Sequence, residues 1–233
     1  MNGIYKHLFF DMDNTLTASR QRINPELADL LHTLPQTISI ISGAKLSRIL
    51  SQTAGLVANR MAQSGNHTTT SDNTVLWREK LPDRYKKEIY AHIFNLKKHT
   101  THSVPDENDL IDDRGSQITF SMYGHNAPHA EKNAFDPDFS YRKKVLSQAP
   151  FNSENIEVNI TGSTCFDYTV KGRNKGFNID RFIKYMNWRH SECLYFGDAI
   201  FPGGNDYTVV GIIDTVKVDS YRDTQKILKE KFT

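Results

Sequence analysis

The feature of this chain that most constrains its fold is an apolar run that ends in carboxylates. Leu8, Phe9 and Phe10 lead directly into Asp11, and Asp13 follows two positions later. Such a run predicts a buried strand of a parallel sheet, and ligands of these sheets bind beyond the C-terminal strand ends. On a continuing strand the two carboxylates would share a face and repel each other. A divalent cation is the simplest partner for them.

Composition narrows the class of protein. With 233 residues, of which 38% are hydrophobic and 24% charged, the chain suits a soluble globular protein of one large or two small domains. The net charge of +2 comes from interspersed signs without a long basic block, so we expect no nucleic-acid partner. Cys165 and Cys193 form no CxxC pair, which favours a reducing, cytoplasmic setting. No segment is long enough to span a bilayer, so no membrane partner is expected.

Strands and helices alternate in the first and last parts of the chain. Strands are predicted at residues 8–11 and 37–41, and helices with one apolar face begin at Pro25 and Lys45. The same pattern returns after residue 172, with a helix near 177–186, strands at 193–196, 209–213 and 215–218, and a terminal helix. This alternation predicts an α/β fold with a Rossmann-like, doubly wound parallel sheet.

The middle of the chain has a different character. A polar turn before residue 75 indicates a hairpin, and a long charged helix is predicted from Pro82 to about His99. Strands are predicted at 116–123, 155–161 and 165–170, with a helix at 141–146. We therefore expect a core domain formed by residues 1–81 and 173–233, interrupted by an inserted α+β cap domain at 82–172.

A second acidic strand end follows residues 193–196. Asp198 comes directly after Gly197, and a glycine-rich loop then ends at Asp206. Alone, this loop is an ordinary turn. Together with the first motif it is a strong signal, because Asp198 and Asp206 could join Asp11 around Mg²⁺, which prefers oxygen ligands.

Two further groups suit a phosphate ester. Ser42 and Gly43 follow the strand at 37–41 and precede a helix, where a hydroxyl and a backbone N–H could bind a phosphoryl oxygen. A serine at this place is more often only a helix cap. Lys175 lies where the chain returns to the core, and its ammonium could balance the charge of a phosphorylated aspartate.

In chain order, residues 11–15, Ser42, Lys175 and the pair Asp198 and Asp206 resemble the four motifs of the haloacid dehalogenase (HAD) superfamily, in its members with a type IIB cap. Residues 196–206 resemble the fourth motif of the eukaryotic-type phosphomannomutases. The resemblance implies that Asp11 is the nucleophile and that Asp13 acts as acid and base. It also implies Mg²⁺ on Asp11, Asp198 and the backbone carbonyl of Asp13.

The cap carries a less complete likeness to the mutases. Arg114 matches the first arginine of the segment that binds the distal phosphate, His125 replaces the second, and Lys132 stands where a third would be. Asp167 matches an acid that contacts sugar hydroxyls. Arginine offers phosphate a bidentate fork that lysine and neutral histidine lack, so we expect a weaker hold on that phosphate.

These residues leave several functions open. The cap has fewer phosphate-binding arginines than the mutases, which favours a Mg²⁺-dependent sugar-phosphate phosphatase. A phosphomannomutase is the alternative. A non-catalytic phosphosugar-binding protein is a lesser alternative. A nicotinamide enzyme is disfavoured because no G-x-G-x-x-G follows the first strand. The mutases pair through their caps, so a homodimer is one expected assembly.

Overall fold

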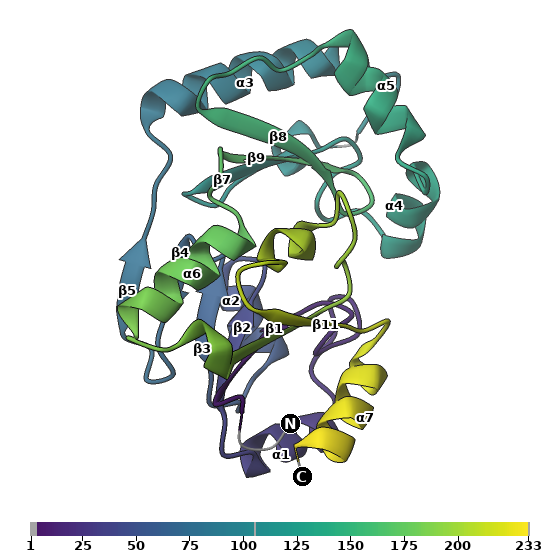
Figure 1. Ribbon diagram of the computed structural model, residues 1–233. Helices are drawn as coiled ribbons and strands as arrows, with labels where there is room; N and C mark the ends of the chain where they lie inside the picture. The colour runs from purple at the N-terminus through teal and green to yellow at the C-terminus, as the bar shows by residue number, and fades with distance from the viewer. Residues whose placement is uncertain (1–3, 105, 233) are drawn as a thin grey trace. The chain divides into compact units, whose positions relative to one another are not determined.

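The structure is a computed structural model that describes residues 4–104 and 106–232. The chain divides into two compact units (Figure 1). The core unit is Met1–Arg78 together with Gly172–Thr233, and the cap unit is Glu79–Lys171. Each unit has its own hydrophobic core.

The core unit is built on a seven-stranded sheet in the order β11-β10-β1-β2-β3-β4-β5. The strands are β1 (His7–Asp11), β2 (Thr37–Ile41), β3 (Asn59–Ala62), β4 (His67–Thr69), β5 (Val75–Arg78), β10 (Cys193–Gly197) and β11 (Asp214–Lys217). The strands from β11 to β3 are parallel, and β4 and β5 extend the sheet as an antiparallel hairpin. The predicted α/β class is confirmed.

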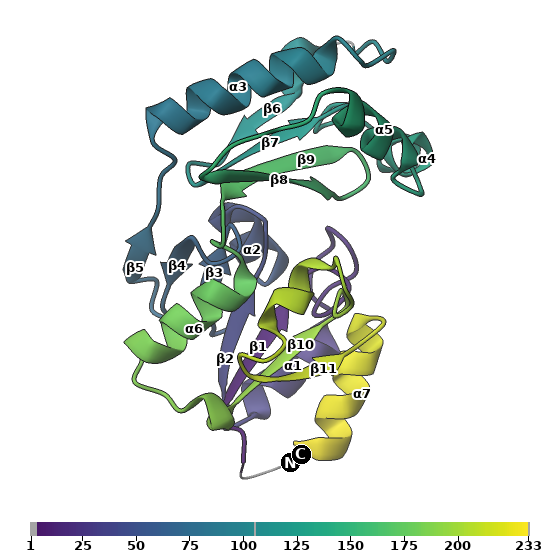
Figure 2. The same cartoon turned by 45° about the horizontal axis from the view of Figure 1, so that its top comes forward.

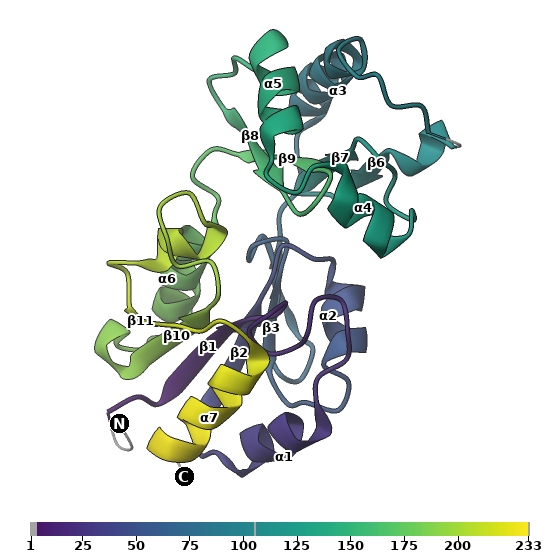
Figure 3. The same cartoon turned by 90° about the vertical axis from the view of Figure 1, so that its right-hand side faces the viewer.

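Helices cover both faces of this sheet (Figure 3). They are α1 (Pro25–Thr33), α2 (Leu46–Gln52), α6 (Lys175–Tyr185) and α7 (Tyr221–Lys231), with short 3-10 turns at His190–Glu192 and Asn205–Val209. Successive residues of β1 point to opposite faces. Leu8 and Phe10 therefore join the core formed with α1, α2 and α7, whereas Phe9 packs in the core formed with α6. Burial on both faces explains the continuous apolar run.

The strand expected at residues 209–213 is wrong. The structure has the 3-10 turn Asn205–Val209 there, followed by a turn. Val209 is fully buried against α6, so its apolar character reflects packing rather than strand pairing. A short apolar run cannot be assigned from composition alone.

The cap unit is an antiparallel sheet in the order β6-β7-β9-β8, and the helices α3 and α5 pack on its apolar face (Figure 2). Its elements are α3 (Asp83–Lys97), β6 (Ile111–Asp113), β7 (Gln117–Ser121), α4 (His129–Phe135), α5 (Ser140–Gln148), β8 (Ile156–Thr161) and β9 (Cys165–Val170), with a 3-10 turn at Glu107–Asp109. Strand residues such as Phe120 and Phe166 pack with Ile89 and Ile93 of α3. The alternate residues form a polar face, on which Thr119 and Asp167 are register partners.

A buried ion pair fastens α5 to the sheet of the cap unit. Arg142 Nε lies 2.6 Å from Asp136 Oδ2, and both side chains are almost completely buried. Arg142 Nη1 also donates to the carbonyl oxygens of Thr161 at 2.7 Å and Gly162 at 3.0 Å. The guanidinium thus supplies hydrogen-bond donors to the backbone carbonyls of the turn between β8 and β9.

We expect Arg142→Met to destabilise the protein by about 3–5 kcal/mol, because it leaves Asp136 buried without its partner. Urea denaturation measures this change. Lys143→Met is the matched control, since Lys143 is the exposed neighbour on α5. Equal unfolding midpoints for the two variants would contradict the stabilising role of the ion pair.

Candidate active site

Neighbouring strands of the core unit deliver the acidic residues to one edge of the sheet. Asp11 is the last residue of β1, and Asp198 follows Gly197 at the end of the adjacent parallel strand β10. Asp206 comes from the 3-10 turn after β10. One carboxylate oxygen from each of Asp11, Asp198 and Asp206 lies within 4.8 Å of the others. The sequence prediction that these three acids meet is consistent with this geometry.

A buried lysine lies between two of these acids. Lys175 begins α6, and its Nζ lies 2.5 Å from Asp11 Oδ1 and 2.6 Å from Asp206 Oδ1. The Tyr195 hydroxyl donates to the same Asp206 oxygen at 2.6 Å, and the backbone N–H of Ala199 donates to Asp206 Oδ2 at 3.0 Å. Both oxygens of Asp206 therefore accept hydrogen bonds, and this residue holds Lys175 against Asp11.

Burial and mutual repulsion shape the charges of this cluster. Burial raises the pKa of Asp11 to about 7, with added repulsion from Asp206 and Asp198, although Lys175 opposes the shift. Burial would also raise the pKa of Asp206, but Lys175 outweighs it and the pKa lies below the ordinary value. Burial disfavours the charged form of Lys175, yet Asp11 and Asp206 raise its pKa. Three carboxylates thus share one ammonium, and this excess of negative charge suits a cation.

Two glycines, Gly197 and Gly204, allow a close approach between the end of β10 and the loop that follows it. A Cβ atom on Gly197 would lie 2.5 Å from Asp206 Oδ2, and one on Gly204 would lie 2.0 Å from the Ala199 carbonyl oxygen. Both distances are far below van der Waals contact. The glycines of this motif therefore serve the close approach of Asp206 to the strand end.

Asp13 and Asn14 lie in the turn that follows β1. Asp13 Oδ1 accepts hydrogen bonds from the Arg20 N–H at 2.6 Å and from Gln52 Nε2 at 3.3 Å. Asn14 has a left-handed backbone with a φ of 62°, which asparagine tolerates well. Its Nδ2 donates to Asp198 Oδ2 at 3.3 Å, so the turn contacts the acidic cluster.

The structure corrects one detail of the expected phosphate contacts. The backbone N–H of Ser42 donates to the Met61 carbonyl at 3.1 Å within the sheet, so it is already engaged. Ser42 Oγ accepts from the Ala44 N–H at 3.2 Å, which leaves its hydroxyl proton to donate. Gly43 follows directly in the loop before α2. The side chain of Ser42, rather than its backbone, is the group that could bind an oxyanion.

The four cap residues that the sequence singled out gather on the polar side of the cap sheet. His125 Nε2 lies 3.3 Å from the Thr119 carbonyl oxygen, and Lys132 Nζ donates to the His125 carbonyl at 2.9 Å. Burial lowers the pKa of His125, and the charges of Arg114 and Lys132 lower it further. The Arg114 Nε pairs with Asp112 Oδ2 at 3.0 Å. His125 is therefore uncharged near neutral pH.

Asp167 is the acidic member of this polar face. It is opposite Thr119 in the sheet. Burial raises the pKa of the nearby Cys165 thiol, and the charge of Asp167 raises it further. Its Oδ1 is buried and has no hydrogen-bond partner among the residues that the structure describes. A buried carboxylate oxygen without a donor suits a ligand that offers a hydroxyl group.

Sequence reasoning missed Tyr195 and Gln52, although both contact site residues. Tyr195 was part of a correctly predicted strand, and a hydroxyl in an otherwise apolar run was the signal that could have identified it. Gln52 ends α2 and is buried. No local pattern distinguishes it from a polar residue at a helix end.

Known structures share this fold. IMP-bound IMP-nucleotidase of Plasmodium falciparum, in an N-terminally truncated form, superposes with a TM-score of 0.65 at 16% identity, over 97% of this chain and 67% of that chain. A phosphatase of the HAD superfamily from Bacteroides thetaiotaomicron gives a TM-score of 0.64 at 15% identity, over 97% and 95% of the two chains. These likenesses show that the chain has the fold of the HAD superfamily.

Sequence comparison gives the family. A family model described as eukaryotic phosphomannomutase matches residues 32–233, so the chain belongs to that family. The phosphomannomutase of Spinacia oleracea is 28% identical over 240 residues, covering 96% of this chain and 94% of that protein. The phosphomannomutase of Drosophila melanogaster is 26% identical over 244 residues, with the same coverage of 96% and 94%. None of the helices in the described residues is long and apolar enough to cross a bilayer.

We expect Lys175→Met to lower the free energy of unfolding by about 3–5 kcal/mol near neutral pH, because two buried carboxylates lose their ammonium. Without Lys175, Asp11 and Asp206 have folded-state pKa values above their unfolded values. The folded state then binds more protons, so the stability of the variant rises as the pH falls from about 8 to about 5.

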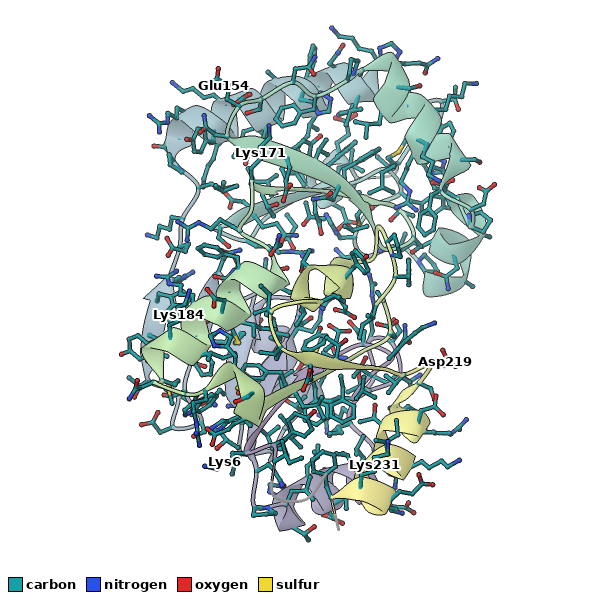
Figure 4. All side chains as sticks on the ribbon, in the orientation of Figure 1. Lys6, Glu154, Lys171, Lys184, Asp219 and Lys231 are labelled. Atoms are coloured by element: carbon teal, nitrogen blue, oxygen red, sulfur yellow. The ribbon has the colours of Figure 1, made fainter. Side chains whose placement is uncertain are left out.

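Thermal denaturation in metal-free buffer at several pH values measures this difference. Lys184→Met is the matched control, because Lys184 is an exposed residue of α6 and points away from the sheet (Figure 4). A destabilisation of Lys175→Met that is the same at every pH would contradict the electrostatic explanation.

Proposed function

We propose that this protein is a Mg²⁺-dependent phosphomannomutase that interconverts hexose 1-phosphate and hexose 6-phosphate through a phosphorylated Asp11. The observation that carries the proposal is the Asp11 carboxylate held by Lys175 beside Asp198. The family match supports the mutase reaction over the phosphatase reaction that the cap sequence favoured. A phosphatase remains the second candidate because the cap has one arginine where the mutases have more.

Each carboxylate at the end of β1 has a distinct role in this proposal. Lys175 donates a hydrogen bond to Asp11 Oδ1, so Oδ2 is the oxygen that attacks phosphorus. As this P–O bond forms, the P–O bond to the sugar breaks, and Asp13 gives its proton to the departing sugar oxygen. In the reverse step Asp13 takes the proton of an incoming hydroxyl group. Ser42 donates its hydroxyl to the phosphoryl group.

The residues of the cluster fit a magnesium ion. All the available donors are oxygens, as Mg²⁺ prefers. Asp11 and Asp198 would hold the ion with the backbone carbonyl of Asp13, whereas Asp206 has both oxygens engaged and instead positions Lys175. When bound, the ion would neutralise charge between the carboxylates and the phosphoryl group.

The polar face of the cap unit is the proposed second anion site. Arg114 and Lys132 supply positive charge, His125 supplies a neutral hydrogen-bonding group, and Asp167 accepts from a sugar hydroxyl. A single arginine fork holds phosphate less firmly than several. We therefore expect a hexose bisphosphate to bind with modest affinity.

The homodimer and the cytoplasmic location remain predictions from the sequence.

The first test follows both products by phosphorus NMR, with mannose 1-phosphate, Mg²⁺ and catalytic glucose 1,6-bisphosphate. We expect hexose 6-phosphate to accumulate without inorganic phosphate, and Asp11→Asn to abolish turnover because the nucleophile is lost. Accumulation of phosphate alone would establish the phosphatase instead. No Mg²⁺-dependent turnover of any hexose phosphate would favour the non-catalytic binding protein.

The metal assignment is tested by thermal denaturation. We expect Mg²⁺ to raise Tm in the wild-type protein, by the equivalent of about 2.7 kcal/mol when the free ion is at about 100 times Kd. Asp198→Asn should lose most of this shift, because a neutral amide is a poor Mg²⁺ ligand. The control is Asp219→Asn, since Asp219 is an exposed residue of the core unit (Figure 4). An equal shift in both variants would remove Asp198 from the metal site.

A further inference from the structure

Gln52 is a buried amide that joins α2 to the turn after β1. Its Nε2 donates to Asp13 Oδ1 at 3.3 Å, to Thr17 Oγ1 at 3.3 Å and to the Gln21 carbonyl at 2.9 Å. The backbone carbonyl of Gln52 also accepts from the Ile23 N–H at 2.8 Å. One residue of α2 is thus in contact with both ends of the turn that carries Asp13.

The partners of Gln52 fix which way its amide points. A carboxylate oxygen and a backbone carbonyl only accept hydrogen bonds, so the group that faces Asp13 and Gln21 must be the NH₂. The opposite orientation would place three oxygens against one another. Gln52 therefore acts as a donor to Asp13 in this structure.

Packing does not explain this side chain. Gln52 Oε1 is buried and has no hydrogen-bond partner within residues 4–104 and 106–232. Leaving a buried acceptor unpaired costs about 1–3 kcal/mol, which a methionine of similar length would avoid. The amide is instead accounted for by what its NH₂ group holds.

The carboxylate of Asp13 accepts hydrogen bonds from the described residues through only one of its two oxygens. Oδ1 receives the Arg20 N–H and the Gln52 NH₂, whereas Oδ2 accepts no hydrogen bond from the described residues. A proton on the carboxyl group therefore belongs on Oδ2, because Oδ1 already faces two N–H groups. This arrangement orients the acidic O–H of Asp13 away from α2.

We propose that Gln52 is a positioning residue that aims the acidic proton of Asp13 at the leaving oxygen of the substrate. The inference rests on the proposed function, in which Asp13 Oδ2 passes its proton to that oxygen as the P–O bond to the sugar breaks. Without the Gln52 donor only the Arg20 N–H holds Oδ1, so the carboxyl group turns about this single contact and the proton faces the leaving oxygen less often. The nucleophile Asp11 is unaffected, since Gln52 does not touch it.

The test compares two phosphate monoesters that differ in their need for an acid. Nitrophenolate leaves 4-nitrophenyl phosphate without a proton, whereas the alkoxide of benzyl phosphate must be protonated as it leaves. The parameter kcat/KM reports the steps up to release of the leaving group, so later hydrolysis of the phosphorylated Asp11 does not enter. With Mg²⁺, we expect Gln52→Met to lower kcat/KM about 10-fold to 100-fold for benzyl phosphate. For 4-nitrophenyl phosphate the loss should be less than about 3-fold.

Thr17→Val is the matched control. It removes another acceptor of Gln52 in the same turn but leaves the contact with Asp13, so it should affect both esters equally. If Gln52→Met does not fold, Gln52→Asn takes its place, because its shorter side chain keeps an amide but no longer reaches Asp13 and should show the same selectivity.

The outcomes separate the inference from the function on which it rests. An equal loss of kcat/KM for both esters would mean that Gln52 only anchors the turn, and would overturn the inference. Unchanged kcat/KM for both esters would also overturn it. If the wild-type protein turns over neither these esters nor a hexose phosphate, the proposed phosphoryl transfer fails, and the role of Gln52 fails with it.

Discussion

The buried ammonium of Lys175 is the interaction on which the rest of the core unit depends. It contacts Asp11 and Asp206, which come from the first strand and from the turn after β10. Removing one partner of such a group leaves an uncompensated charge in a region of low dielectric constant. The contact therefore fixes α6, β1 and the loop after β10 together. It also holds the Asp11 carboxylate beside Asp206, so one ionic contact supports both the fold and the geometry of the acidic cluster.

Much of the core could be predicted from residues 8–11 and 193–206, because strand ends are marked by a change from apolar to acidic residues. Parallel strands bring those ends to one edge, so the meeting of Asp11, Asp198 and Asp206 followed from topology. The contacts of Gln52 and Tyr195 could not be predicted, because they join elements far apart in the chain and depend on side-chain reach. The strand predicted at 209–213 is a different kind of error. Val209 is buried by packing against α6, and this apolar run resembled the pattern of a strand.

The two sheets place different constraints on their sequences. The core sheet is covered by helices on both faces, so the middle of β1 and β10 is apolar except for the hydroxyl group of Tyr195, and the carboxylates lie at or beyond the strand ends. The apolar face of the cap sheet packs against α3 and α5, and the alternate residues of β7 and β9 form the opposite, more polar face. The polar residues of β7 are nonetheless buried, so their side chains need hydrogen-bond partners within the protein.

The strand order of the core unit also determines when the catalytic edge can form during synthesis. β1 is paired on one side with β2 and on the other with β10, which begins 182 residues after the end of β1 and follows the whole cap unit. Until β10 leaves the ribosome, β1 has an open strand edge, and Asp11 has neither Lys175 nor Asp206 nearby. Open edges are sites of wrong pairing between chains. The edge of β1 is therefore open to wrong pairing until the segment that follows the cap unit has been synthesised.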